Sequence, residues 1–393
     1  MTETTSKNPF RPGVGIQPRY LAGRDKAIAN FRAILRSSPD IPANMRVTGL
    51  RGVGKTVLLH KFAEQAHQDG WFAAVLELQP RHNSDKAIKE LLLELMKQKR
   101  QEISTLEKVR AVVGKAAKTA ANFKLEFNNI GLSYGGTPDE DKDLMKELLD
   151  VTNLAIESGY EGFILMLDEA QIIKDDTSAK GEHPLSILIA TVAGLQKNPV
   201  PFGLVICGLP PLASNLLRAR SYSERMFRGE LVSSLDEQEA REAFTKPLED
   251  TGIIATDKLV DEVVKEVEGY PYFIQLWGAG LCDAAYSAGT VELTPELLEV
   301  IQPDIYKRLD LDFYQPRVET LTPAEQDVLL STVKCKYPPI ITADLGKAND
   351  KTVGNINVLL GRLAQSGVIY RLRKGQYEYT APKFRQYLER HPQ

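Results

Sequence analysis

The stretch VTGLRGVGKTVLLHKF, residues 47–62, constrains the fold more than any other part of the chain. Its β-branched first residues predict a strand, its glycine-rich turn predicts a loop, and its periodic apolar run predicts a helix. The stretch satisfies the pattern G-x-x-x-x-G-K-[ST], in which backbone N–H groups converge on phosphate oxygens. We therefore expect a nucleotide-phosphate site that contains Gly49, Gly52, Val53, Gly54, Lys55, Thr56 and Val57.

A second, acidic stretch completes the expected site. The run ILMLDE, residues 164–169, is apolar until it ends in two carboxylates. Continuous apolar runs are typical of strands that are buried on both faces of a parallel sheet. We expect Thr56 and Asp168 to hold Mg²⁺ at the end of this strand. Lys55 would reach the outer phosphates of ATP, and Glu169 would polarise the attacking water as the catalytic base.

Strands and helices alternate over the first 235 residues, and this alternation predicts an α/β fold with a parallel sheet. Strands are expected at 46–48, 71–78, 162–167 and 202–207, and helices at 25–36, 55–66, 85–99, 144–156 and 185–196. From residue 236 the strand signal disappears and helical periodicity takes over. The expected divisions are an extended lead-in at 1–19, a P-loop α/β domain at 20–235, a helical lid at 236–315 and a winged helix at 316–393.

Four stretches, in order, resemble the AAA+ and STAND group of P-loop ATPases, particularly proteins with an origin-recognition-like ATPase domain. Two of them are GLRGVGKT and ILMLDEAQ. YLAGRDKAI, residues 20–28, resembles the family's N-terminal box, in which the backbone around Gly23 and Arg24 lies beside the adenine. EGYPYFIQLWG, residues 268–278, resembles the STAND GxP motif, with Gly269 and Pro271 on the base side. Taken alone, these last two stretches also fit a turn before a helix and a helix break.

The chain departs from this family pattern in its sensor residues. The family usually carries a polar residue at the end of the strand after the acidic one, but only Cys207 and Gly208 stand there. No arginine follows Pro271 in the next helix, which favours the STAND branch. Arg225 and Arg228 come after the last expected strand, where related proteins carry an arginine aimed at a γ-phosphate, in cis or from a neighbouring subunit. Alternatively, these two arginines belong to an exposed turn.

An insertion is expected at about residues 100–140, because Lys55 and Asp168 lie 113 positions apart (168 − 55), farther than a compact core requires. A basic helix at 104–122 and a hairpin at 123–136 are expected inside it. The insertion could be a docking surface, or it could be a structural elaboration of the same domain.

The C-terminal segment has the order of a winged helix. Thr322 is a candidate N-cap whose capping box Glu325 completes, and Pro323 stands at the first helical position. Helices at 343–348 and 352–366 follow, the latter with a core face of Val353, Ile356, Leu359, Leu360 and Leu363, and then two strands. The candidate contacts for double-stranded DNA are Arg362, Arg371, Arg373 and Lys374. Winged helices also bind proteins, so a protein partner or a packed lid stays open.

Composition indicates a globular chain, and the basic C-terminal residues permit an anionic partner such as nucleic acid. Residues 318–393 contain eleven Lys/Arg and seven Asp/Glu, a local charge of +4, against −3 for the whole chain. No run reaches 18 consecutive apolar residues and the first residues are polar, so neither a membrane span nor a secretory signal is expected, and we expect a cytoplasmic protein. Cys207, Cys282 and Cys335 lack the spacing of a zinc site or a disulfide framework.

These features predict an ATPase switch that uses ATP and Mg²⁺ and whose nucleotide state controls homo-oligomerisation and DNA binding. One alternative is a regulatory STAND-type NTPase, in signalling or phage defence, whose winged helix binds a protein partner. Another is a nucleotide-binding scaffold that never turns over.

Overall fold

The computed structural model describes residues 8–113, 144–176, 178, 181–349 and 351–391. The chain divides into two compact units whose segments interleave in sequence. The sheet unit consists of Asp25–Gly49 and Lys55–Leu231. The helical unit consists of Met1–Arg24, Leu50–Gly54 and Val232–Gln393. Most of the insertion expected at 100–140, including the whole expected hairpin, lies outside the described residues.

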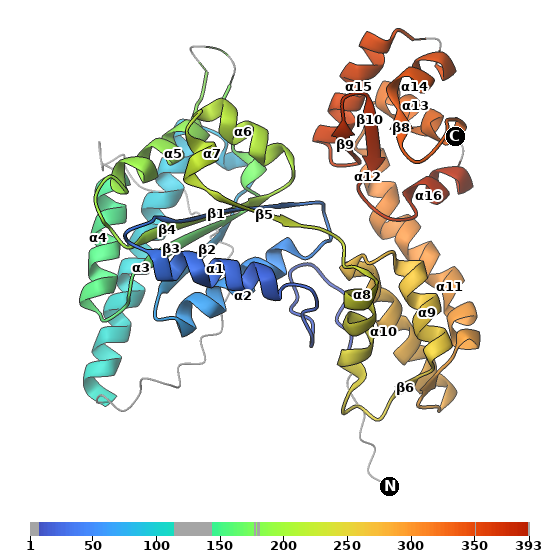
Figure 1. Ribbon diagram of the computed structural model, residues 1–393, viewed down its shortest axis with the longest axis horizontal. Helices are drawn as coiled ribbons and strands as arrows, with labels where there is room; N and C mark the ends of the chain where they lie inside the picture. The colour runs from blue at the N-terminus through green and yellow to red at the C-terminus, as the bar shows by residue number, and fades with distance from the viewer. Residues whose placement is uncertain (1–7, 114–143, 177, 179–180, 350, 392–393) are drawn as a thin grey trace. The chain divides into compact units, whose positions relative to one another are not determined.

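A five-stranded sheet with the order β2-β3-β4-β1-β5 forms the centre of the sheet unit (Figure 1). Its strands are β1 Ala43–Gly49, β2 Phe72–Glu77, β3 Phe163–Asp168, β4 Phe202–Gly208 and β5 Arg228–Val232. The pairs β1–β4, β3–β4 and β2–β3 are parallel. Every residue of β3 and β4 is buried, as their continuous apolar runs predict. Because parallel strands end at the same edge, Asp168 and the end of β4 come together there.

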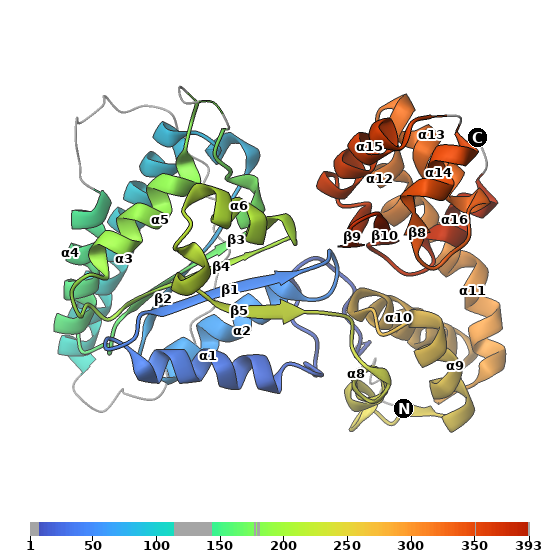
Figure 2. The same cartoon turned by 45° about the horizontal axis from the view of Figure 1, so that its top comes forward.

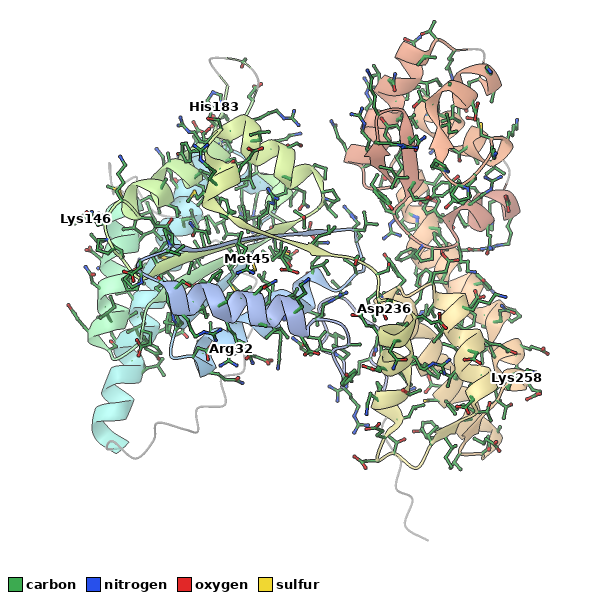
Figure 3. The ribbon with its side chains drawn as sticks, viewed as in Figure 1. Arg32, Met45, Lys146, His183, Asp236 and Lys258 are labelled. Carbon is green, nitrogen blue, oxygen red and sulfur yellow. The ribbon has the colours of Figure 1, made fainter. Side chains whose placement is uncertain are left out.

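Helices cover both faces of this sheet (Figure 2). One face carries α1 Asp25–Ser37 and α2 Lys55–Gln68, whose Phe31 and Phe62 rings stack with centroids 4.4 Å apart. The other face packs Phe163, Leu165 and Leu167 against apolar residues of α4 Leu144–Glu157 and α5 Pro184–Leu195. Helices α3 Asp85–Val113 and α6 Pro211–Ala219 complete this layer. On α1, Arg32 (labelled in Figure 3) donates to both oxygens of Asp69.

The strand β5 is a correction to the sequence expectation, which placed Arg225 and Arg228 after the last strand. Arg228 is the first residue of β5, next to β1 at the edge of the sheet. The segment RGELV is short, mostly exposed and contains a glycine and two charges. Edge strands tolerate such a sequence, so no apolar run marked it.

In the helical unit, Phe10 anchors the part of the expected lead-in that the structure describes. Phe10 is 3% exposed, stacks on Phe244 with centroids 5.4 Å apart and lies against Gly278. The following helices are α8 Glu237–Thr245, α9 Asp257–Val267, α10 Pro271–Ala288 and α11 Pro295–Leu309. A short parallel pair, β6 Ile254–Ala255 and β7 Glu292–Leu293, accompanies them. Asp236 (labelled in Figure 3) caps α8 by accepting from Glu239 N at 2.8 Å.

The C-terminal residues of this unit form helices around a three-stranded sheet. The elements are η4 Asp310–Tyr314, α12 Gln315–Glu319, α13 Pro323–Ser331, η5 Thr332–Lys334, β8 Ile340–Ile341, α14 Thr342–Ala348, α15 Val353–Gln365, β9 Ile369–Arg373, β10 Gln376–Tyr379 and α16 Phe384–Arg390. The expected capping box of Thr322 and Glu325 is present. The expectation that Val353 joins the core was wrong: it is 50% exposed in the first turn of α15, and the buried stripe begins at Ile356.

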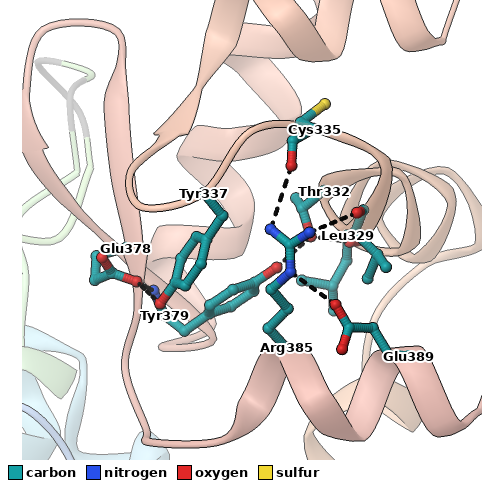
Figure 4. A network of polar contacts seen from close by, with 9 residues as sticks. Leu329, Thr332, Cys335, Tyr337, Glu378, Tyr379, Arg385 and Glu389 are labelled. Atoms are coloured by element: carbon teal, nitrogen blue, oxygen red, sulfur yellow. Dashed lines mark hydrogen bonds and ion pairs between the residues drawn. The ribbon is translucent and has the colours of Figure 1, made fainter.

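A polar network joins this sheet to the surrounding helices (Figure 4). Arg385 donates to Val333 O at 2.8 Å, to Cys335 O at 3.2 Å and to Glu389 at 2.8 Å. The Tyr379 hydroxyl shares a hydrogen bond with Thr332, and burial raises the pKa of Tyr379 to about 12. These bonds satisfy backbone carbonyls that would otherwise be costly to bury. In the part of the chain that the structure describes, none of the helices is both long and apolar enough to span a membrane.

Candidate nucleotide site

The glycine-rich stretch takes the strand, loop and helix form that its sequence predicts. Strand β1 ends at Gly49 and helix α2 begins at Lys55. Gly52 and Gly54 have φ angles of 76° and 91°, in the region that favours glycine. A Cβ on Gly54 would meet no described atom within 4 Å, so the backbone is open there. An open backbone before the first turn of a helix fits a phosphate group.

Arg24 fastens this loop from within the helical unit. Its guanidinium donates to Val53 O at 3.0 Å, to Ser233 O at 2.9 Å and to Gly23 O at 3.2 Å, and the residue is only 7% exposed. The side chain is therefore engaged by backbone carbonyls. Gly23, with φ 65°, lies where a Cβ would collide with the carboxyl group of Glu239. The left-handed φ favours glycine before the arginine, and the Glu239 carboxyl group fills the space beside it.

Tyr270, the residue directly before α10, holds the same loop, a role that the sequence did not predict. Its hydroxyl donates to Arg51 O, and its phenol ring occupies the space that a Cβ on Gly52 would need. Burial raises the pKa of Tyr270 to about 12, so the hydroxyl keeps its proton, while the nearby Arg317 lowers that pKa. Arg317 in turn stacks over Phe313, 3.6 Å from the ring centroid. A chain of contacts thus links the loop to the C-terminal residues of the helical unit.

The structure gives the expected GxP residues a backbone role. Gly269 has φ 66°, its carbonyl accepts from Leu235 N at 2.8 Å, and a Cβ there would collide with Leu235 O. Pro271 is the first residue of α10 and follows the end of α9. The helix break that the sequence allowed is therefore present, and contact of these residues with a base stays a prediction.

The structure brings together the two residues expected to hold a metal. Thr56 Oγ1 donates to Asp168 Oδ2 at 2.6 Å, and Asp168 is 2% exposed. Both oxygens are hard donors of the kind that Mg²⁺ prefers. Among the described residues no group of three or more His, Cys, Asp or Glu side chains could hold a metal ion. The pair therefore fits Mg²⁺ that completes its coordination with water and substrate phosphates.

Glu169 leaves β3 in a left-handed conformation, with φ 52° and ψ 32°. Its N–H donates to Asp168 Oδ1 at 2.8 Å. Its carboxylate accepts from Nε2 of Gln171, the last residue of ILMLDEAQ, for which the sequence predicted no role. The carbonyl oxygen of that amide accepts from Leu209 N at 2.9 Å, directly after β4.

Two further side chains adjoin this acidic edge. Burial, and then the charge of Asp168, raise the pKa of Cys207 well above its ordinary value, so the thiol stays neutral. Glu77 is the register partner of Asp168 at the end of β2. Burial raises the pKa of Glu77, with smaller contributions from Asp168 and Glu169.

The expected arginines lie at the edge of the sheet unit. Arg225 is exposed on the short helix α7 Ser223–Met226. Arg228 donates to Asn30 Oδ1 of α1 at 2.6 Å, and Asn30 donates to Glu230 at 3.0 Å. Arg228 is thus engaged with α1 in this conformation, and a γ-phosphate role for either arginine stays a prediction.

The residues expected to contact DNA are exposed on α15 and on the β9–β10 hairpin: Arg362, Arg371, Arg373 and Lys374. Arg373 Nε donates to Gln376 Oε1 at 2.7 Å, and the turn between the strands contains Lys374 and Gly375. These positions leave basic side chains available to an anion.

Two family models match parts of the chain. Residues 20–202 match the family described as the AAA ATPase domain, and residues 311–388 match a domain of unknown function. No curated protein matches the chain.

Solved structures share the fold at low identity. A Walker-type ATPase of Pyrococcus abyssi is 17% identical with a TM-score of 0.59, and the match covers 96% of this chain and 98% of that one. The ORC2 protein of Aeropyrum pernix, solved in ADPNP–ADP complexes, is 14% identical with a TM-score of 0.57, and the match covers 96% of each chain. At such identity the likeness concerns the fold, and it confirms the expected P-loop NTPase fold of AAA+ type.

Proposed function

Because residues 20–202 match the AAA ATPase domain and the chain shares the fold of the Aeropyrum pernix ORC2 protein, we propose that the protein is an ATP-hydrolysing switch. Its nucleotide state would control self-association and DNA binding. The observation that carries the hydrolytic part is the bond of 2.6 Å between Thr56 Oγ1 and Asp168 Oδ2, because it joins the two predicted metal ligands beside Glu169. The ADPNP and ADP of the Aeropyrum pernix structure support adenine nucleotides as ligands.

The residues have distinct tasks in this proposal. Lys55 binds the outer phosphates, and the open backbone at Gly54 receives phosphate oxygens. Thr56 and Asp168 hold Mg²⁺, which when bound neutralises charge that develops on the phosphates. Glu169 orients the water and accepts its proton as the water oxygen bonds to the γ-phosphorus and the bond to the ADP oxygen breaks.

The test of hydrolysis compares ATP turnover of the wild type with that of Glu169→Gln. We expect turnover to fall by about 100-fold or more while ATP binding persists, because the amide cannot accept the proton. Glu161→Gln is the matched control, since Glu161 is exposed and lies before β3. Equal turnover in the wild type and Glu169→Gln would contradict the assignment of the base.

DNA binding is proposed from the exposed basic side chains of α15 and the hairpin. Duplex affinity should fall with salt, and Arg371→Ala combined with Arg373→Ala should weaken binding and lower the salt slope by about 0.9 per lost phosphate contact. Lys258→Ala with Lys265→Ala, on the exposed face of α9, is the control. Unchanged affinity in the arginine variant would remove these residues from the interface.

A protein partner is the second candidate for this surface. The supporting observation is apolar exposure beside the basic residues: Val353 is 50% exposed, Val358 57% and Leu372 49%. Exposed apolar side chains are typical of protein contacts where they gather into one patch. If duplex binding persists in the arginine variant and also in variants of these three apolar residues, that result would favour a protein partner.

We propose self-association because, in a nucleotide-controlled switch, the bound nucleotide would determine whether copies of the protein assemble. The mass of the protein in solution, measured with ADP and with a non-hydrolysable ATP analogue, tests it. Equal mass in both states would contradict a nucleotide-controlled assembly.

A further inference from the structure

The turn after β3 brings a glutamine back onto the proposed base. Glu169 adopts a left-handed conformation, which costs a residue with a side chain about 1 kcal/mol or more. The conformation starts the short turn η2 Ala170–Ile172, in which Ile172 N donates to Glu169 O at 3.0 Å. This turn carries Gln171 to the carboxylate of Glu169.

Both ends of the Gln171 amide are used, and each partner fixes its orientation. A carboxylate oxygen only accepts, so Nε2 must face Glu169 Oε2. A backbone N–H only donates, so Oε1 must face Leu209 N, at 2.9 Å. A flipped amide would lose both bonds. Gln171 therefore connects the carboxylate of Glu169 to the end of β4.

The end of β4 is shaped to admit this amide. A Cβ on Gly208 would overlap Gln171 Oε1 and would lie 3.1 Å from Gln171 N. Any side chain at position 208 would displace the amide. The sequence lacks a polar residue at the end of β4, and the structure puts a polar group there from the neighbouring turn instead.

We propose that Gln171 is the positioning residue for Glu169, a role that rests on the proposed hydrolytic function. By binding Oε2 it fixes the rotamer of Glu169 and leaves Oε1 to accept from the attacking water. Gln171 supplies from the turn after β3 the polar contact that no side chain at the end of β4 supplies. Gln171 contacts Glu169 and affects the reaction only through that residue.

The decisive variant is Gln171→Glu, which has nearly the same shape. Its carboxylate still accepts from Leu209 N, but it cannot donate to Glu169 and it adds a like charge. We expect kcat to fall by about 10-fold to 100-fold, the size of a hydrogen bond to a charged group, with ATP affinity unchanged. Gln171→Ala should give a similar loss. Gln101→Ala, at an exposed glutamine of α3, is the matched control.

A double variant separates positioning from a structural role. If Gln171 acts only through Glu169, then Glu169→Gln with Gln171→Ala turns over no more slowly than Glu169→Gln alone. A structural role would instead make the two losses multiply. A readout without turnover is hydrogen exchange of the Leu209 amide, which should speed up in Gln171→Ala and stay slow in Gln171→Glu.

The outcomes keep this inference distinct from the proposed function. Wild-type turnover that Glu169→Gln abolishes and Gln171→Glu leaves intact would overturn the role of Gln171 and leave the proposed function standing. Multiplying losses in the double variant would do the same. A wild type that binds ATP and does not turn over would overturn both. A melting curve for each variant shows that it is folded.

Discussion

The two halves of the proposed nucleotide site are held in different ways. At the acidic edge, Asp168, Glu169 and Gln171 contact one another within four consecutive positions. The glycine-rich loop is held by distant residues: Arg24 lies 29 positions from Val53, and Tyr270 lies 219 positions from Arg51. Local chain geometry thus orients the carboxylates, whereas the shape of the loop depends on remote segments. Changes at the loop should therefore alter nucleotide affinity, and changes at the acidic edge should alter metal use and turnover.

The largest effect is expected from Gly52→Ala. Alanine would be strained at φ 76°, and its Cβ would collide with the Tyr270 hydroxyl. Strain and overpacking together should cost about 2–4 kcal/mol, seen as weaker ATP binding by calorimetry or as a lower melting temperature. Gly361→Ala is the control, because a Cβ on that glycine of α15 meets no described atom within 4 Å. Wild-type behaviour of Gly52→Ala would mean that Tyr270 does not confine the loop.

Arg24→Ala should have the second-largest effect. It leaves the carbonyls of Val53 and Ser233 without the guanidinium, and bonds to a charged donor contribute about 1.5–3 kcal/mol each before solvent replaces them. We expect the free energy of unfolding to fall by about 2–3 kcal/mol and ATP affinity to fall, with kcat at saturating ATP unchanged. Arg36→Ala, at an exposed arginine of α1, is the control in chemical denaturation. If Arg24→Ala lowered kcat and left ATP affinity unchanged, the distinction between the loop and the acidic edge would be wrong.

Thr56→Val tests the acidic edge with a side chain of similar shape. Loss of the hydroxyl that bonds Asp168 should raise the Mg²⁺ concentration for half-maximal turnover by about tenfold. Titration of Mg²⁺ at fixed ATP measures the change, and Thr105→Val on the exposed side of α3 is the control. An unchanged Mg²⁺ requirement would exclude the hydroxyl as a ligand.

Tyr270→Phe should have the smallest effect. It removes the hydroxyl bond to Arg51 O and keeps the ring, so ATP affinity should fall by a factor of about five, equivalent to about 1 kcal/mol. Tyr286→Phe, at an exposed tyrosine of α10, is the control. Tighter ATP binding in Tyr270→Phe would show that the hydroxyl restrains the loop in a form that disfavours nucleotide.

Those parts of the site that depend on local sequence were predictable. The loop and the β3 carboxylates follow from a glycine pattern and an apolar run, and the parallel sheet brings Thr56 and Asp168 together. Gln171 was within the quoted motif, but its role depends on a bond to Leu209, 38 positions later. The hydrophobic periodicity of the sequence does not predict such a bond.

Other features were hidden for physical reasons. Strand β5 is short and polar, and its pairing with β1 alone makes it a strand. Tyr270 reads as an ordinary residue between a helix-ending glycine and a helix-starting proline. Its contacts with Arg51 and Arg317 join distant parts of the sequence and arise only when the chain is folded. The exposure of Val353 likewise depends on what packs around α15 and cannot be read from its spacing.

The interleaving of the two units restricts how this protein can be divided or recombined. The backbone passes from one unit to the other four times, after Arg24, Gly49, Gly54 and Leu231. No single proteolytic cleavage can therefore release either unit as an intact fragment. A gene fusion that exchanged residues from 232 onward with those of a relative would leave Leu50–Gly54 facing foreign neighbours. Inheritance of the loop and of Tyr270 is thereby coupled, and a viable chimera must carry both from the same parent.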